Sequence, residues 1–212
     1  MVDTYSIAQY AYGQLNKDTA EDSLKKLCAD LLRYGKEAQL FKGYRTDALV
    51  NASMTEAHRA WLSDAEAVTF GNNNRILEDL DSPVVTWVGK ALDLDSKVSL
   101  KYIFTPGTYG GAVEDLTLRI FYINNSGTVS MTTATDPVLY NEALNSYAFT
   151  FDGLLASELR TIVDVAVYAG DTRLSQTLRY SPDTYGNGKT GQLLTLCKAL
   201  FAYSDTAKAY FA

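Results

Sequence analysis

Apolar side chains of helical period form the clearest pattern in the chain, and this pattern occurs once near each end. In residues 23–41 they recur at intervals of three and four positions, which places them along one face of an α-helix. A shift of 169 residues (197 against 28) brings the same face onto residues 192–210. The shift aligns Leu24 with Leu193, Leu27 with Leu196, Cys28 with Cys197, Leu31 with Leu200, Tyr34 with Tyr203 and Ala38 with Ala207. The sequence therefore predicts two helices that repeat each other in their packing face.

Shorter helical segments precede and follow the first copy. Residues 5–15 carry apolar side chains on one side, and Thr55 is a suitable start for a further short helix. Gly43 is placed to end the long helix as a C-cap glycine. Gly35, inside that helix, costs on the order of 1 kcal/mol relative to alanine, and a close contact would account for it. We expect residues 1–63 to form an N-terminal helical segment.

From residue 64 onward the period changes to the alternation that is typical of strands. The alternating segments are 84–88, 98–104, 116–122, 147–151, 162–168 and 174–180. Turn signals such as Pro106-Gly107 and Asp152-Gly153 separate them. The spacing predicts an α+β protein in which residues 64–186 form an antiparallel β-sandwich of immunoglobulin or fibronectin type. Spacing alone leaves an open barrel as the alternative.

The second copy of the helix, within residues 187–212, follows directly from the last predicted strand. We expect it to pack on the sandwich or on the N-terminal helices. In a tandem array the first copy would cover a preceding sandwich, which this chain lacks, so its face must be buried against the short helices or the neighbouring sandwich. That face consists of Leu24, Leu27, Leu31, Tyr34 and Phe41.

The composition is that of a globular protein. Of the 212 residues, 47% are hydrophobic and 21% are charged, which allows a sizeable core. The formal net charge is −6 and no basic run offsets it, so we expect no binding to nucleic acid. No apolar run approaches the roughly 20 residues that cross a bilayer, so no membrane span is expected in this segment.

Tyrosine is unusually frequent, with 15 residues against 8 phenylalanines and 2 tryptophans. Its ring packs while its hydroxyl stays hydrated, which suits half-buried sheet faces and also binding surfaces. In a binding surface, exposed rings would stack on sugar faces as in a carbohydrate-binding module. The candidate ligand-binding residues are Trp87, Tyr102, Tyr109 and Tyr122. Trp87 also suits a core position, because it lies between Val85 and Val88.

The sequence does not indicate nucleophilic catalysis. His58 is the only histidine and lies on a polar turn beside Arg59, so we expect a solvated surface side chain and not a catalytic base. No G-x-S-x-G motif occurs, and the Gly-Lys-Thr sequence at Gly188 lacks the spacing of a nucleotide-binding loop. We therefore expect no catalytic residues.

Several acidic residues follow the predicted helical segment. A hydrolase would use two of them, but Asp93 and Asp95 alternate with leucines and are expected to point to solvent from one strand face. Asp79 and Asp81, with the asparagines at 72–74, offer hard oxygen ligands from loops, which suit Ca²⁺. These two aspartates are the candidate metal ligands, and no other cofactor is indicated.

Cys28 and Cys197 occupy equivalent positions of the repeated helix, each preceded by leucine. Neither has a C-x-x-C partner or a histidine neighbour, so metal binding is not indicated. We expect both thiols to be reduced and buried, as small apolar side chains.

Residues 31–51 are similar to the segment ALLNYGAAAQTYFNYNTDNLAN, and residues 152–159 to a GLSAKEL segment that leads into two strands and a helix. Both segments recur in large secreted, repeat-built surface proteins of anaerobic gram-positive bacteria, and the chain resembles a module of that family. It departs from the family pattern at Cys28, Cys197 and Ser204, where only packing is affected.

The resemblance implies an extracellular module without assigned catalysis. It also implies neighbouring modules of the same polypeptide, a polysaccharide or a host surface protein as partners. The first residues lack the charged start and apolar stretch of a signal peptide, which leaves either a cytosolic protein or a part of a longer secreted chain. The resemblance favours the longer secreted chain, and this is the expectation. The expected function is a non-catalytic structural or adhesive module at the cell surface. A carbohydrate-binding module is the first alternative, and a hydrolase that uses acidic residues is the second.

Overall fold

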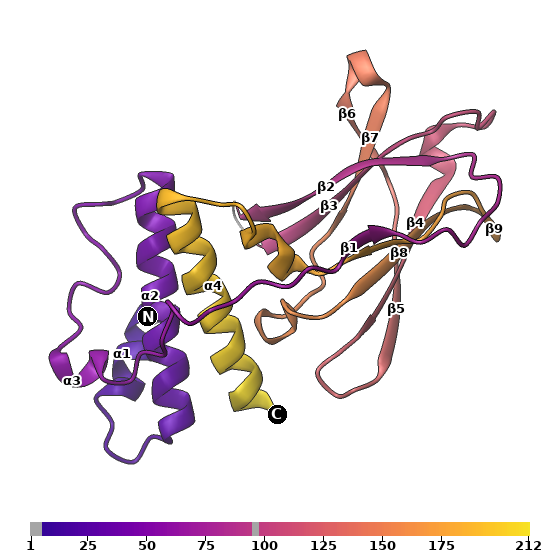
Figure 1. Ribbon diagram of the computed structural model, residues 1–212. Coiled ribbons are helices and arrows are strands. Elements are labelled where there is room, and N and C mark those ends of the chain that lie inside the picture. The colour runs from indigo at the N-terminus through magenta and orange to yellow at the C-terminus, as the bar shows by residue number, and fades with distance from the viewer. Residues whose placement is uncertain (1–5, 95–97) are drawn as a thin grey trace, which may run out of the picture. The chain divides into compact units, whose positions relative to one another are not determined.

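The computed structural model describes residues 6–94 and 98–212 and divides into two compact units (Figure 1). The helical unit comprises the described residues up to Phe70 together with Gly186–Ala212. The strand unit comprises the described residues of Gly71–Tyr185. The first and last segments of the chain therefore belong to the same unit.

Local sequence signals set the ends of the helices. The α-helices of the described residues are α1 (Ile7–Leu15), α2 (Asp22–Lys42), α3 (Glu56–Arg59) and α4 (Gly191–Phe211). At the start of α1, Ser6 Oγ accepts from the Gln9 backbone N–H at 3.1 Å while the Gln9 side chain accepts from the Ser6 N–H at 2.9 Å, a reciprocal capping box. Gly43 ends α2 with a φ of 63°, a left-handed conformation that glycine adopts without a Cβ clash.

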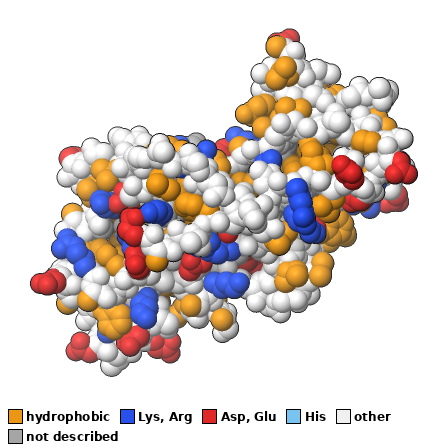
Figure 2. Space-filling model, in the orientation of Figure 1, with side chains coloured by type: hydrophobic (Ala, Val, Ile, Leu, Met, Phe, Trp, Pro, Cys, Tyr) orange, Lys and Arg blue, Asp and Glu red, His pale blue; other side chains and the backbone are white. Residues whose placement is uncertain are grey.

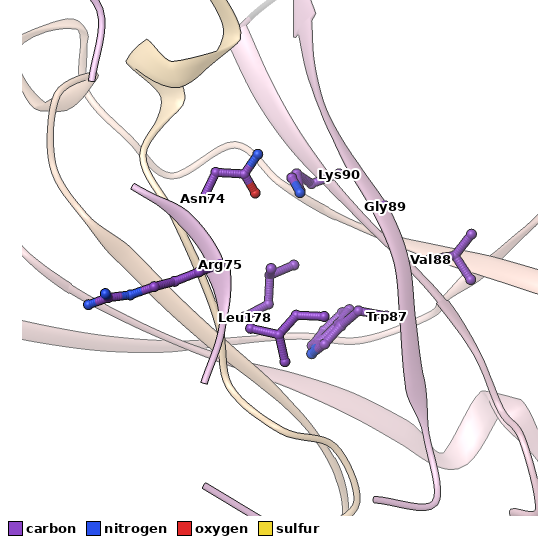
Figure 3. A pocket seen from close by; sticks show the side chains of 8 residues that line it. Asn74, Arg75, Trp87, Val88, Gly89, Lys90 and Leu178 are labelled. Atoms are coloured by element: carbon purple, nitrogen blue, oxygen red, sulfur yellow. The ribbon is translucent and has the colours of Figure 1, made fainter. Parts of the chain in front are cut away.

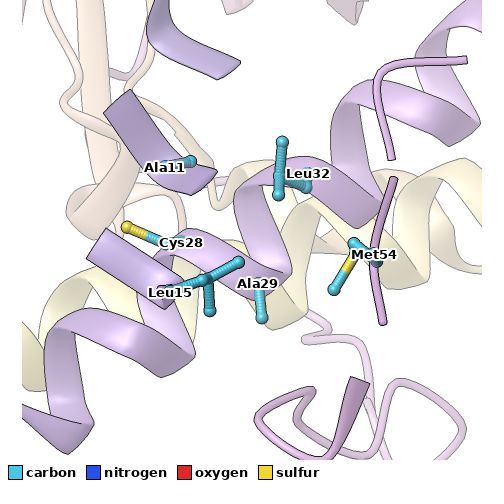
Figure 4. Packing of buried hydrophobic residues seen from close by; sticks show 6 residues of the cluster. All are labelled: Ala11, Leu15, Cys28, Ala29, Leu32 and Met54. Atoms are coloured by element: carbon cyan, nitrogen blue, oxygen red, sulfur yellow. The ribbon is translucent and has the colours of Figure 1, made fainter. Parts of the chain in front are cut away.

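A small apolar core joins α2 to α1 and to the segment after α2. Its buried members are Ala11, Leu15, Cys28, Ala29, Leu32 and Met54 (Figure 4). Gly35 allows the segment after α2 to approach the helix closely, because a Cβ at this position would lie 2.8 Å from Val50 Cγ1. A close contact thus accounts for the glycine inside the helix, as expected.

The C-terminal helix α4 packs against α2 in the helical unit (Figure 1). Both helices have 21 residues, and their bounds are offset by 169 residues at each end, 191 against 22 and 211 against 42. The helices run antiparallel, since Gln192 at the start of α4 donates to Glu37 near the end of α2 at 2.8 Å. The aligned residues Tyr34 and Tyr203 stack with parallel rings and 6.0 Å between their centroids.

Contacts between α2 and α4 are reciprocal. Burial raises the pKa of Tyr34, and Tyr203 and Cys197 of the other helix add to the rise. Burial likewise raises the pKa of Tyr203, and Cys28 of the other helix adds to it. Each tyrosine therefore lies near the aligned cysteine of the opposite helix. The two stacked tyrosines thus have similar electrostatic surroundings, while Cys28 also belongs to the core that α2 shares with α1.

Two placements were expected for the C-terminal helix, on the sandwich or on the N-terminal helices. Pairing with α2 is the second of these. Within the helical unit, α1 and α4 together cover the apolar surface of α2. Phe41 is an exception to the expected face, because its side chain is 39% exposed. Cys28 and Cys197 are free and buried, as expected, and burial raises the pKa of each thiol to about 11.

His58 is buried, so the expectation of a solvated surface histidine is wrong. Its backbone N–H donates to Thr55 Oγ1 at 3.2 Å, and its Nδ1 accepts from the Thr55 N–H at 3.4 Å, which caps α3. The Nε2 atom hydrogen-bonds Asn16 Oδ1 at 3.1 Å, and the Tyr12 ring lies against the imidazole with 6.2 Å between centroids. His58 is therefore a structural link between α3 and the end of α1. The polar residues beside it in sequence do not reveal these partners.

The strand unit contains two antiparallel sheets. Its strands are β1 (Asn74–Ile76), β2 (Thr86–Leu94), β3 (Val98–Thr105), β4 (Leu116–Ile123), β5 (Val129–Ala134), β6 (Val138–Asn141), β7 (Ser146–Phe151), β8 (Val163–Ala169), β9 (Thr172–Arg173) and β10 (Leu178–Tyr180). One sheet has the order β1-β10-β8-β4-β5, with β9 also paired to β8, and the other has the order β2-β3-β7-β6. Short 3-10 helices occupy Val113–Asp115, Glu142–Leu144, Ala156–Glu158 and Pro182–Gly186.

Alternating apolar side chains of the two sheets form the core of the strand unit. On β3, the side chains of Leu100, Tyr102 and Phe104 are at most 2% exposed. Tyr122 of β4 contacts Phe151 of β7 with 5.8 Å between ring centroids, which joins the two sheets. The chain is thus an α+β protein with a sandwich-like pair of antiparallel sheets, as predicted at this level of detail.

Edge strands account for most differences between the predicted and observed strands. Predicted segments coincide in part with β2, β3, β4, β7 and β8, whereas the segment 174–180 forms a strand only at β10. The pattern missed β1, β5, β6 and β9, whose side chains are all exposed or half-buried. Because these strands bury no continuous face, their sequences show no sustained apolar alternation.

Truncation of the two aligned leucines tests the packing of the helix pair. Leu200 is 1% exposed, so Leu200→Ala is expected to lower the free energy of unfolding by about 2–5 kcal/mol. Leu31 is only half-buried, so Leu31→Ala is expected to cost distinctly less. Urea denaturation followed by far-ultraviolet circular dichroism measures both. A near-neutral Leu200→Ala would show that α4 does not depend on this contact.

Candidate functional site

The four candidate sugar-stacking residues do not share one surface. Trp87 and Tyr102 are neighbours, with 6.5 Å between their ring centroids in an edge-to-face contact. Tyr122 instead contacts Phe151, and Tyr109 lies in the loop after β3. Tyr102 is fully buried, so the expectation that its ring is exposed for sugar stacking is wrong. It belongs to the inward row of β3, and that row is core.

An irregularity in β2 decides which of its side chains face the interior of the sandwich. The pairing with β3 shifts between Trp87 and Gly89, so Val88 is an extra residue in the strand. This β-bulge reverses the alternation of faces. Lys90 consequently pairs with the inward-facing Tyr102 and shares the inner face with Trp87.

A cleft of about 230 Å³ opens between β1 and β2, at one edge of the sandwich (Figure 3). Each of these strands is the outermost strand of its sheet, so neither is covered by a further strand on this side. The residues that line the cleft are Asn74, Arg75, Ile76, Trp87, Val88, Gly89, Lys90 and Leu178. They combine an apolar wall with a few polar groups, the composition that is typical of small-ligand sites.

Lys90 is the charged group that faces the interior of this cleft. Figure 3 shows its side chain near that of Asn74, whereas the Arg75 side chain points away. Within residues 6–94 and 98–212, no hydrogen bond or ion pair engages the side chain of Lys90 or of Asn74. Burial lowers the pKa of Lys90, because desolvation disfavours its charged form. The cleft therefore presents an uncompensated ammonium group beside a free amide.

Trp87 is held in a fixed orientation at the wall of the cleft. Its indole Nε1–H donates to the backbone oxygen of Gln176 at 2.8 Å, and one ring edge meets Tyr102. Leu178 of β10 also lines the cleft (Figure 3). A half-buried ring whose position is fixed in this way gives a ligand an apolar contact at little further entropy cost.

Asp79 holds the loop after β1 and is not free to bind a metal. Its Oδ1 accepts from the Arg173 guanidinium and from the Thr177 backbone N–H at 3.0 Å, and its Oδ2 accepts from Thr177 Oγ1 at 2.7 Å. Desolvation alone would raise the pKa of this carboxyl, but these donors together lower it to about 2. Both carboxylate oxygens of Asp79 therefore accept hydrogen bonds that stabilise the fold. Asp81 is left as the other aspartate proposed for the calcium site.

Among the described residues, the acidic side chains proposed for a hydrolase do not form a site either. Asp93 pairs with Lys101 across the strands at 2.7 Å, and Asp95 lies outside the described residues. In the described part of the chain, no group of three or more His, Cys, Asp or Glu side chains is placed to hold a metal ion. The lowered pKa of Asp79 is opposite to what a catalytic general acid needs.

A fully buried carboxylate in the helical unit also has a structural role. Asp30 Oδ1 accepts from Arg33 Nη2 at 2.6 Å, and its Oδ2 accepts from Ser63 Oγ at 2.6 Å. The Arg33 Nη1 atom donates to the Ser63 backbone oxygen at 2.7 Å. These hydrogen bonds hold the segment after α3 against α2. They also explain why the charge of Asp30 is tolerated at a fully buried position.

Sequence reasoning missed Lys90 and Asn74 as site residues. Lys90 lies just after the predicted segment 84–88, and nothing in its sequence neighbours distinguishes it from an ordinary exposed lysine. The available signal was Gly89, because a glycine inside a strand often marks a bulge that changes the faces of the residues after it. Asn74 belongs to β1, a strand of three residues without an apolar pattern.

Exposed apolar side chains gather on the β6–β7 hairpin, which projects from its sheet (Figures 1 and 2). Val138, Leu139, Tyr140 and Leu144 are each more than half exposed. On the face shown in Figure 2, acidic and basic side chains are interspersed. None of the helices in the described residues has the length and apolar character to cross a membrane.

The role of Asp79 gives a pH-dependent expectation. Its folded pKa of about 2 lies below the ordinary value of 3.8, so its ionised form stabilises the fold above about pH 4, and this stabilisation is lost as the pH falls through 2. Because the side chain is 36% exposed, screening limits the effect, and Asp79→Asn is expected to cost about 1 kcal/mol at neutral pH.

Urea denaturation of both proteins between about pH 7 and pH 2 measures this difference. Asp81→Asn is the matched control, since Asp81 is exposed and lacks such partners in the described chain. A stability difference for Asp79→Asn that stays constant down to the lowest pH would contradict the assignment.

Comparison of the chain with protein-family models, with curated proteins and with solved structures finds no match in any of the three. The resemblance to a bacterial surface-protein module thus rests on residues 31–51 and 152–159 alone. The geometry of the chain is the remaining basis for a functional proposal.

Proposed function

We propose that this chain is a non-catalytic structural or adhesive module of a larger secreted protein at a bacterial surface. Its sheets would then belong to the immunoglobulin or fibronectin type of sandwich, and α2 and α4 would be two copies of one repeated helix. The equal length and constant offset of α2 and α4 carry the proposal, because a repeat-built protein produces such a relation directly.

Reciprocal packing of the two helices defines what kind of module this would be. In the proposed repeat, each helix would direct its repeated face mainly at the other, and α1 would cover Leu24 and Cys28 of α2. The helical unit would then bury this face within one chain. Contacts with neighbouring modules of the same polypeptide would use other surfaces.

The β6–β7 hairpin is the surface that suits such a contact best. Its exposed apolar side chains lie on an edge strand, and exposed apolar clusters commonly mark contacts between proteins. We assign this hairpin to a neighbouring module of the same polypeptide. The assignment explains why β6 keeps apolar residues although its side chains are all exposed.

Carbohydrate binding is a second candidate function, and the cleft beside Trp87 is the observation that favours it. The exposed rings proposed from the sequence do not support it, because Tyr102 is core and Tyr122 packs on Phe151. A hydrolase is supported less well, since Asp79 and Asp93 are both engaged by basic side chains.

Immunoblotting of the organism that encodes the chain tests the proposed setting directly. An antibody raised against the purified chain is expected to detect a polypeptide far larger than its 23.3 kDa, in the secreted or cell-wall fraction. Cytosolic and secreted marker proteins serve as fractionation controls. A band near 23 kDa confined to the intracellular fraction would contradict the proposal.

A further inference from the structure

The cleft between β1 and β2 holds a positive charge that no lining residue neutralises. None of its lining side chains is a carboxylate, although the protein as a whole carries a net charge of −6. Glu78 and Asp81 follow β1 closely but line a separate hollow beyond Ile76. We propose that this cleft binds the carboxylate of an acidic monosaccharide unit, such as a terminal uronic acid residue of a polysaccharide. The site does not depend on the structural role proposed above, and it specifies the ligand for the carbohydrate binding named there as the second candidate.

Lys90 would provide the anion contact. The β-bulge at Val88 turns this lysine from the outer face, where water would solvate it, to the inner face beside Trp87. A partly desolvated ammonium without a partner is unfavourable, and burial accordingly lowers its pKa. A bound carboxylate would restore the lost interaction through a charge-assisted hydrogen bond. Bulges commonly occur beside functional sites, where they redirect a side chain in this way.

The other cleft residues favour a sugar over a simple organic acid. The Asn74 amide offers both donors and an acceptor, which matches the hydroxyl groups of a sugar ring. Trp87 and Leu178 provide an apolar wall for the C–H groups of the ring. The three kinds of contact, with an anion, with hydroxyls and with an apolar face, occur together on acidic sugars.

The size of the cleft limits the ligand to one such unit. Its volume of about 230 Å³ lies below the roughly 300 Å³ at which the usual sites for larger ligands begin. The cleft opens at the sandwich edge, where β1 and β2 have no further strand beside them. A terminal residue of a chain can therefore enter while the rest of the chain remains outside.

Titration of the ¹⁵N-labelled full chain with D-galacturonate, followed by NMR, tests the proposal. The expected result is saturable shifts of the Trp87 indole and Asn74 side-chain amide signals. Lys90→Met keeps the length of the side chain and removes its charge, and should weaken binding by about tenfold or more. Asn74→Ala should weaken it to a smaller degree. Lys101→Met, which removes a lysine from the outer face of the adjacent strand, is the matched control and should bind as the wild type does.

Two further ligands decide which chemistry the cleft recognises. Galactose should bind far more weakly than galacturonate, because it lacks the carboxylate. N-acetylglycine carries a carboxylate without the sugar ring and should also bind more weakly. The proposal is overturned if galactose binds as well as galacturonate, if N-acetylglycine binds equally well, if Lys90→Met binds as the wild type does, or if galacturonate produces no saturable shifts at these signals.

Discussion

The apolar surface that α2 and α4 cover together is the constraint on which the helical unit depends. A helix gains most of its stability in a protein from packing one face, and not from the preferences of its residues. On α4, Leu196 and Leu200 are each 1% exposed, and burial of each such side chain contributes about 1.5–3 kcal/mol. Because α2 and α4 come from the two ends of the described chain, this contact also joins its first and last segments in one unit. Neither helix is expected to remain folded without the other.

A different constraint shapes the strand unit. Two sheets that pack face to face leave open edges, and the fold places an outer strand of each sheet, β1 and β2, at one of them. The bulge at Val88 then directs Lys90 into that opening. The candidate site thus arises from a break in the regular pattern, and the sandwich around it holds Trp87 and Leu178 in place. Structural and binding roles are compatible in such a protein, since they use different parts of it.

The sequence predicted those parts of the fold in which one face is buried. Helices α2 and α4 and strands β3, β4 and β8 follow directly from apolar periodicity, and the glycine caps and turns follow from local chemistry. Edge strands β1, β5 and β6 bury too little to leave a pattern. The partners of His58, Asp30 and Asp79 come from distant segments, so no local signal indicates their burial or engagement.

The candidate site was less predictable than the fold for a physical reason. Trp87 was identified by its chemistry, but Lys90 acquires its role only because one extra residue reverses the alternation of β2. A single-residue change of register moves each later side chain to the other face, and Gly89 was its only local sign. Tyr102 shows the opposite error, because aromatic chemistry suggested a binding ring where the alternation of β3 already placed it in the core.

A double-mutant cycle on Tyr34 and Tyr203 tests the reciprocal pairing of α2 and α4 most directly. The free energy of unfolding would be measured for the wild type, Tyr34→Leu, Tyr203→Leu and the double variant. Because the rings stack with 6.0 Å between centroids, we expect a coupling energy of about 0.5–1.5 kcal/mol between the two positions. Strictly additive losses would contradict direct packing of the two aligned tyrosines, and with it the closed helix pair on which the proposed module rests.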